Sequence, residues 1–296
     1  MTIEDRASSL AVKLSGLGIN LIAAAAFSTI FALLVDRENR SLVEHQLDEH
    51  FDAHTSKLLA AVSSLNTAYL PTVVHAPTKG YDPAFNTRLM ADLNHSAYYY
   101  FRGPSAKYIA ARLKALRRRP DLIRIYIPSP DSMASIKFDI ANRSRTRREE
   151  VADVSALYKR FRDDTLAAVI GLFDCRAYGK IEIFFCEDTL VSRYELTERH
   201  LYISWYTSLE NESSMFPETT VFPRTSHHYQ AMMIDMERRA SFANHSLLIG
   251  PELGWDQFTL QLESIFGEKY DDGKILELAR AYWDERANFL TFLSSL

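Results

Sequence analysis

Cysteine is scarce in this chain, with two residues among 296, Cys175 and Cys186. Two cysteines cannot form the disulfide framework of a small secreted domain, and a chain of this length can build a hydrophobic core without one. They belong to no C-x-x-C pattern, so we interpret both as packing residues. The chain also shows no internal repeat and no low-complexity tract, which argues against repeat architectures.

The recognised catalytic motifs are absent as well. The chain contains no G-x-S-x-G, H-E-x-x-H, G-x-G-x-x-G, P-loop or protein-kinase signature. His45, His50 and His54 lie near one another on an expected helix, but no glutamate follows His50 in the zinc-protease pattern, so we expect neither a metal nor a cofactor. The net charge of -4 gives no general attraction to nucleic acid, and basic clusters at 112–120 and 142–150 suit a helix end and an exposed loop.

One long stretch lacks charge altogether. Residues 14–35 are 22 consecutive uncharged residues between Lys13 and Asp36. As a helix they would cover roughly 33 Å, enough for a bilayer core of about 30 Å, so the pattern predicts a transmembrane helix. One alternative is a cleaved signal peptide, but bulky and charged residues follow the stretch where a cleavage site needs small ones. The other alternative is a buried core helix. We expect a single pass through the inner (plasma) membrane, the lipid bilayer as a partner, and a cytoplasmic body.

Two periodic patterns predict a homo-oligomer. The first is a stripe of small or polar residues within the uncharged stretch, typical of close helix association or a pore lining: Gly16, Asn20, Ala24, Ser28 and Ala32. The second is a heptad-like seam that ends before Pro71: Leu47, Phe51, His54, Leu58, Ala61, Leu65 and Ala68. The alternatives are a stripe that arose by composition and a helix that packs on its own domain.

The remaining pattern predicts an α/β domain, with α+β as the alternative. We expect a tail at 1–13, a helical stalk at 36–70, a linker at 71–82 and a soluble domain at 83–296. Two strand signals flank a helical run between 97 and 127, which is typical of a parallel βαβ unit. Strands at 180–186, 191–197 and 200–206, the last two as a hairpin, predict a mixed sheet of about five or six strands. Further helices are expected at 132–140, 150–173, 226–245, 255–266 and 274–293.

The order of these elements resembles the phospholipase D-like fold, especially a degenerate version in bacterial proteins. The resemblance covers roughly 97–245, in YYYFRGPSAKYIAARL, IRIYIPSPD, KIEIFFCEDTLVSRYELTERHLYISWYTS and VFPRTSHHYQAMMIDMERR. In the active family a His-x-Lys pair supplies the nucleophile and grips phosphate. The matching region here reads SRYELTERHLYISWY, and the chain contains no His-x-Lys. The resemblance therefore implies the fold without that phosphodiesterase chemistry.

Two turns are candidate anion sites. In FRGPSAKY, Gly103 permits a tight turn, Ser105 occupies an N-cap position, and Arg102 and Lys107 add positive charge. In FPRTSHHYQ the candidates are Arg224, the cap Ser226, and His227 and His228 in the first helical turn. Ordinary helix capping is the alternative at both turns. If both open on one cleft, they would bind a phosphorylated small molecule.

These patterns favour a non-catalytic sensing or effector domain that acts through oligomerisation at a membrane, for instance in bacterial stress or phage defence. One alternative is a membrane-anchored phosphodiesterase or nuclease-like hydrolase that uses His200, His227 or His228 together with Arg102 and Arg224. The other is a passive scaffold or adaptor, whose cleft aromatic side chains such as Tyr99, Tyr202 and Trp205 would fill.

Overall fold

The computed structural model describes residues 15–27, 37–137, 154–188, 191–206, 216–243 and 245–296. The chain divides into two units, residues 1–64 and residues 65–296. The first unit contains a helix at residues 15–27 and most of the long helix α2 (Arg37–Tyr69), which continues into the second unit. As Pro71 predicts, α2 ends two residues before it.

The predicted transmembrane helix over residues 14–35 was wrong. Within that stretch the described helix covers residues 15–27, about 20 Å at 1.5 Å per residue. None of the helices in the described part of the chain is sufficiently long and apolar to span a membrane. This finding also contradicts the predicted single-pass location in the inner membrane. The prediction treated all 22 uncharged residues as one helix, and of its stripe Ser28 and Ala32 lie outside the described residues.

The described part of residues 65–296 folds as α/β around a mixed sheet of eight strands, where five or six were predicted. The central strands β2 (Tyr98–Arg102), β3 (Leu122–Pro128) and β4 (Lys180–Cys186) are parallel, and all the other neighbours are antiparallel. On one side of this trio lie β5 (Ser192–Leu196), β6 (His200–Trp205), β7 (Thr219–Pro223) and β1 (Val73–His75), and on the other side β8 (His245–Ile249).

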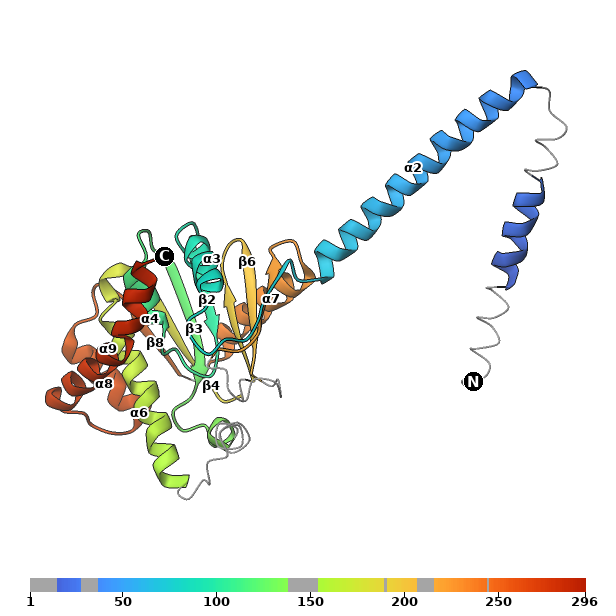
Figure 1. Ribbon diagram of the computed structural model, residues 1–296. Coiled ribbons are helices and arrows are strands. Elements are labelled where there is room, and N and C mark those ends of the chain that lie inside the picture. Colours follow the sequence, from blue (N-terminus) through green and yellow to red (C-terminus); the bar gives the residue numbers. More distant parts are fainter. Residues whose placement is uncertain (1–14, 28–36, 138–153, 189–190, 207–215, 244) are drawn as a thin grey trace, which may run out of the picture. The chain divides into compact units, whose positions relative to one another are not determined.

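Helices cover both faces of the sheet (Figure 1). The larger core lies beneath α3 (Pro83–Leu93), α4 (Ile109–Ala115), α6 (Val154–Phe173), α8 (Trp255–Phe266) and α9 (Asp272–Ser294). The smaller core lies beneath α7 (His227–Phe242). Side chains alternate between the two faces along each strand, so Tyr99 and Phe101 join the larger core while Tyr98 and Tyr100 join the core under α7.

The locally encoded elements agree with the sequence patterns. The predicted βαβ unit is β2–α4–β3, and the predicted hairpin is β5–β6. The strands β1, β7 and β8 and the helix α3 were not predicted. β1 lies inside the expected linker at 71–82, where three extended residues are too few to show an alternating pattern.

Candidate anion-binding cavity

Three charged side chains lie buried between the sheet and the helices α3 and α4. Arg112 is 2% exposed, Glu195 is 1% exposed and Arg193 is 7% exposed. Arg112 belongs to α4, between Ile109 and Leu113 on the face of the helix that packs in the core. Arg193 and Glu195 are two residues apart in β5, so both side chains project from the same face of the sheet. Such residues are almost never fully buried unless they are paired.

Glu195 binds both arginines. The Nη1 of Arg112 donates to the two carboxylate oxygens of Glu195 at 3.2 and 3.0 Å, and the Nε of Arg193 lies 3.1 Å from Oε1. The Tyr99 hydroxyl donates to Oε2 at 2.6 Å. Burial and the neighbouring carboxylate raise the pKa of Tyr99 well above its usual value, so this hydroxyl stays neutral. The buried cluster of Arg112, Arg193 and Glu195 therefore holds two positive charges and one negative charge.

Within the described part of the chain, the second positive charge of this cluster has no carboxylate of its own. Among the described residues, neither arginine forms an ion pair except with Glu195. Both arginines also donate to uncharged groups: Arg193 Nη2 donates to Ser204 Oγ at 2.9 Å, and Arg112 Nη2 donates to Asn86 Oδ1 at 3.4 Å. Arg193 interacts with the Tyr206 side chain as well. Both Nε atoms are buried without a hydrogen bond. Burial by itself would lower the pKa of Arg193, but Tyr206 and Glu195 outweigh it and raise the pKa, so this guanidinium stays charged.

Both arginines line a cavity of about 60 Å³. Its other described walls are Phe101, Ser105, Tyr108, Ile109, Tyr206, Phe216 and Pro217. A water needs roughly 10–15 Å³ of such space, so this cavity has room for several waters or for one small oxyanion. A second cavity of about 10 Å³ also borders Arg193, and His75, whose Nε2 is buried without a partner, lies in its wall.

Gly103 lets the turn after β2 pack directly against this cluster. A Cβ atom at this position would lie 2.8 Å from Phe101 Cζ and 3.2 Å from Arg193 Cγ. The first distance is too short for a real contact, so any side chain would displace the Phe101 ring and press on Arg193. Gly103, which was predicted to permit a tight turn, is therefore needed so that this turn can pack closely against Phe101 and Arg193.

The residues predicted around Gly103 have separate roles. Ser105 lines the cavity but caps no helix, because α4 begins at Ile109 and its N-cap residue makes no capping bond through its side chain. Arg102 points to the α7 face, where its Nη2 donates to Asp188 at 2.8 Å. The Nζ of Lys107 lies 2.6 Å from Asp164 of α6. Of the predicted residues in this turn, Gly103 and Ser105 thus adjoin the cavity, while both cations are neutralised elsewhere.

The second predicted turn lies at the opposite end of the sheet. Arg102 pairs in the sheet with Tyr194, near the start of β5, whereas Pro223, the neighbour of Arg224, pairs with His200 beyond the other end of β5. The two turns therefore do not open on one cleft. Ser226 is the N-cap of α7, and its Oγ accepts from the backbone N–H of Tyr229 at 3.1 Å. Ordinary capping is thus the role that the structure gives to Ser226.

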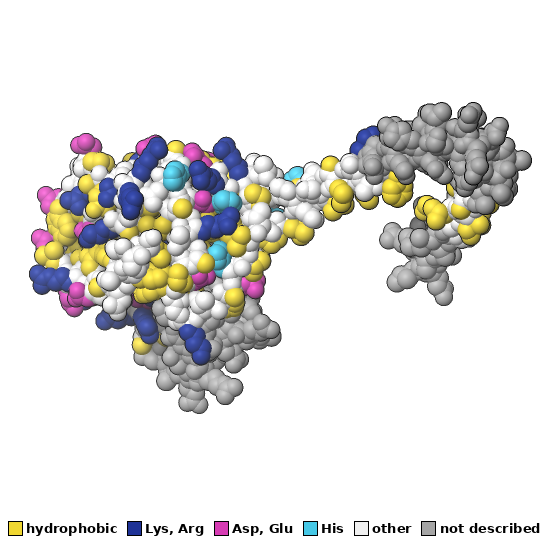
Figure 2. All heavy atoms as spheres, turned by 45° about the horizontal axis from the view of Figure 1, so that its top comes forward, with side chains coloured by type: hydrophobic (Ala, Val, Ile, Leu, Met, Phe, Trp, Pro, Cys, Tyr) yellow, Lys and Arg dark blue, Asp and Glu magenta, His cyan; other side chains and the backbone are white. Residues whose placement is uncertain are grey.

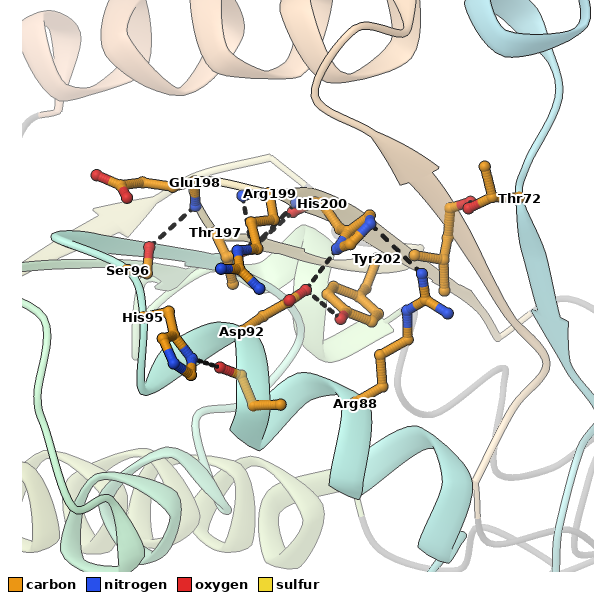
Figure 3. A network of polar contacts seen from close by, with 12 residues as sticks. Thr72, Arg88, Asp92, His95, Ser96, Thr197, Glu198, Arg199, His200 and Tyr202 are labelled. Carbon is orange, nitrogen blue, oxygen red and sulfur yellow. Dashed lines mark hydrogen bonds and ion pairs between the residues drawn. The ribbon is translucent and has the colours of Figure 1, made fainter.

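The three candidate histidines do not converge. The His200 side chain contacts α3, where its Nδ1 lies 2.6 Å from Asp92 Oδ2 (Figure 3). His227 and His228 begin α7, on the other face of the sheet. Their rings lie against Tyr69 and Phe222. A catalytic site built from these histidines with Arg102 and Arg224 is therefore not formed.

The network around His200 connects β6 to α3. Asp92 Oδ2 also accepts from the Tyr202 hydroxyl at 2.6 Å, and Arg88 Nη2 lies 3.4 Å from His200 Nε2 (Figure 3). Burial by itself would raise the pKa of Asp92, but the hydrogen bonds from His200 and Tyr202 outweigh it. The pKa of Asp92 is therefore below its usual value, and this group remains a carboxylate. An aspartate–imidazole pair can orient a general base. Here the second imidazole nitrogen faces a guanidinium, so we interpret the network as structural.

The residues predicted for oligomerisation lie in helices wherever the structure describes them. Gly16, Asn20 and Ala24 are exposed on the helix at 15–27. Phe51, Leu58 and Leu65 of α2 are also exposed. Leu47 belongs to α2, but its side chain is not among those described.

The cluster itself was not predicted, although the sequence carries two signals of it. Arg193 and Glu195 alternate with apolar residues in a strand that is followed at once by another, so one charged pair had to face a core. Arg112 was grouped with the basic residues that follow it. Its position between Ile109 and Leu113 indicates the buried face of the helix instead.

Comparison with known proteins shows no family for this chain. No family model and no curated protein matches it. Among solved structures, a similar chain is TrmBL2, an archaeal chromatin protein that shows a novel mode of DNA binding. The identity is 8% and the TM-score 0.28, over 70% of this chain and 65% of the length of that chain. A likeness this low carries no argument about fold or function, and the phospholipase D-like resemblance stays a prediction.

Proposed function

We propose that residues 65–296 form a binding module for a small oxyanion of the phosphate class. The observation that carries this proposal is the buried cluster of two guanidinium groups and one carboxylate beside a cavity of about 60 Å³. An uncompensated charge in a protein interior costs several kcal/mol, and an anion in the cavity would remove that cost. Guanidinium N–H groups are also the preferred donors to phosphate and carboxylate oxygens.

The other walls of the cavity limit the ligand. Ser105, Tyr108 and Tyr206 carry hydroxyl groups that can donate to anion oxygens, whereas Phe101 and Phe216 offer only apolar surface. Burial raises the pKa of Tyr108, so its hydroxyl keeps the proton that it would donate. The volume suits a free oxyanion or the terminal phosphate of a larger molecule, and it is too small for a whole nucleotide.

The same surroundings favour binding over catalysis. None of the described residues that line the larger cavity is a histidine, a cysteine or a carboxylate. The cavity does carry the hydroxyl groups of Ser105, Tyr108 and Tyr206, but a hydroxyl nucleophile usually needs such a neighbouring general base for phosphoryl or acyl transfer. A bound anion would therefore be held unchanged, as in a sensing domain.

The experiment is thermal unfolding of the full chain in phosphate, sulfate or chloride at constant ionic strength. We expect phosphate to raise the Tm progressively, because a ligand at 100 times its Kd stabilises the folded state by about 2.7 kcal/mol. Arg193→Met should abolish this response. Arg224→Met is the matched control, since it removes an exposed arginine at the opposite end of the sheet. Equal responses in all three proteins, or none in the wild type, would refute the proposal.

A further inference from the structure

A stripe of large apolar side chains is exposed along α2. Its members are Phe51 (74% exposed), Leu58 (66%), Val62 (47%), Leu65 (59%) and Tyr69 (52%). The last four follow one another at intervals of four, three and four residues, and Phe51 precedes Leu58 by seven, so all five lie on one face of the helix. Figure 2 shows apolar side chains along this helix. We call this set the α2 stripe.

The helix around the last four residues of the stripe is almost uncharged. Between His54 and Tyr69 the only Asp, Glu, Lys or Arg is Lys57, and the polar positions are mostly Ser, Thr and Asn. A helix that stays in water normally carries charged residues opposite its apolar face. From Leu58 to Tyr69, a second copy of the same surface would therefore meet no block of like charges, which normally keeps identical helices apart. Like charges (Asp48, Glu49 and Asp52) occur only around Phe51, at the N-terminal end of the stripe.

We infer that the α2 stripe is covered by the α2 stripe of a second copy of this chain, in a parallel two-stranded coiled coil. Leu58 and Leu65 occupy d positions and Val62 the a position between them, and leucine at d with a β-branched residue at a favours parallel dimers. Identical stripes are self-complementary in this arrangement. This seam differs from the one predicted from the sequence. The predicted seam contained Ala61 and Ala68, whereas this one contains the neighbouring and larger residues Val62 and Tyr69. The inference does not depend on the anion cavity.

The first test is the molar mass of the full chain by light scattering. We expect a dimer for the wild type and a monomer for Leu58→Asp/Leu65→Asp, because each copy would place two charges in the seam. The matched control is Ser56→Asp/Ala60→Asp, which adds the same charge on the opposite face of α2 and should remain a dimer. A monomeric wild type, or dimers for both variants, would overturn the inference. Phosphate should raise the Tm of the dimer and of the monomeric variant alike.

The second test establishes the helix direction by cross-linking. In a parallel dimer each residue of the seam faces the same residue of the other copy. Phe51→Cys and Leu65→Cys, made separately in a Cys186→Ser background, should therefore both give disulfide-linked dimers under mild oxidation, whereas Ser56→Cys should not. Cross-linking at neither stripe position, or at only one of them, would contradict a parallel coiled coil.

Discussion

Glu195→Gln is the substitution that most directly tests the charge of the buried cluster. The amide keeps the shape of the carboxylate and an acceptor for the Tyr99 hydroxyl, but it removes the only negative charge that the described residues place between Arg112 and Arg193. The cluster then changes from two positive charges and one negative to two positive charges alone. Since breaking a buried ion pair by removing one partner costs about 3–5 kcal/mol, we expect a loss of this size in the free energy of unfolding without phosphate.

Phosphate should then recover part of that loss. An anion beyond the guanidinium groups would lie roughly 6–8 Å from Glu195, where two like charges at an effective dielectric constant near 20 repel by about 2–3 kcal/mol. Removing the carboxylate removes this repulsion. We therefore expect the variant to bind phosphate at least about tenfold more tightly than the wild type, after allowance for solvent screening.

The assay is urea unfolding, monitored by tryptophan fluorescence, over a series of phosphate concentrations at constant ionic strength. The gain in unfolding free energy with phosphate gives the apparent Kd of each protein. Arg193→Met is the companion variant, because it leaves Arg112 paired with Glu195 and should abolish the phosphate dependence. The reasoning is refuted if Glu195→Gln is as stable as the wild type without phosphate, or if phosphate stabilises it less than it stabilises the wild type.

Three other predictions concern packing and titration. A Cβ on Gly171 of α6 would overlap the Tyr282 ring of α9, so Gly171→Ala should lower the free energy of unfolding by about 1–3 kcal/mol in urea titrations. Burial, opposed by Asp82, holds the pKa of His75 below 6.5, so the unfolded chain binds the proton first and stability falls as the pH drops below about 6.5. His75→Gln should flatten that fall in the urea midpoint. Burial raises the thiol pKa to about 12 for Cys175 and about 11 for Cys186, so at pH near 8 iodoacetamide should label the native chain far more slowly than the unfolded chain.

Each of these predictions has a contrary result. Unchanged stability in Gly171→Ala would mean that α6 and α9 are not packed as closely as the structure gives. Equal pH dependence in the wild type and His75→Gln would show that His75 does not titrate differently in the folded and unfolded chains. Labelling of native Cys186 at the rate of the unfolded thiol would contradict its raised pKa.

The elements that the sequence predicted well depend on local signals. The helix α8 begins and ends where its pattern does, with Gly267 in a left-handed conformation after its last turn and Phe258, Leu262 and Phe266 buried at helical spacing. The helix α3, which was not predicted, has an equally local signal: an Asp82 cap followed by proline at the first helical position. Such elements can be found without knowledge of their partners.

The candidate site could not be predicted in the same way. The sequence places Arg193 and Glu195 on one face of a strand, but it does not indicate that Arg112, 83 residues before Glu195, occupies the helix above them. Whether the two predicted turns open on one cleft also depends on strand order. The register of β5, β6 and β7 places Arg224 far from Arg102. The prediction of a transmembrane helix from the uncharged stretch at 14–35 was wrong for another reason, because a lack of charged residues does not determine the length of a helix.

Isothermal titration calorimetry of phosphate into the full-length wild type, beside Arg193→Met, tests the oxyanion site most directly. We predict one phosphate bound per chain by the wild type and no binding heat from Arg193→Met, with Arg224→Met indistinguishable from the wild type. Absence of binding by the wild type, or binding that survives Arg193→Met unchanged, would contradict the assignment of the cavity as an oxyanion site.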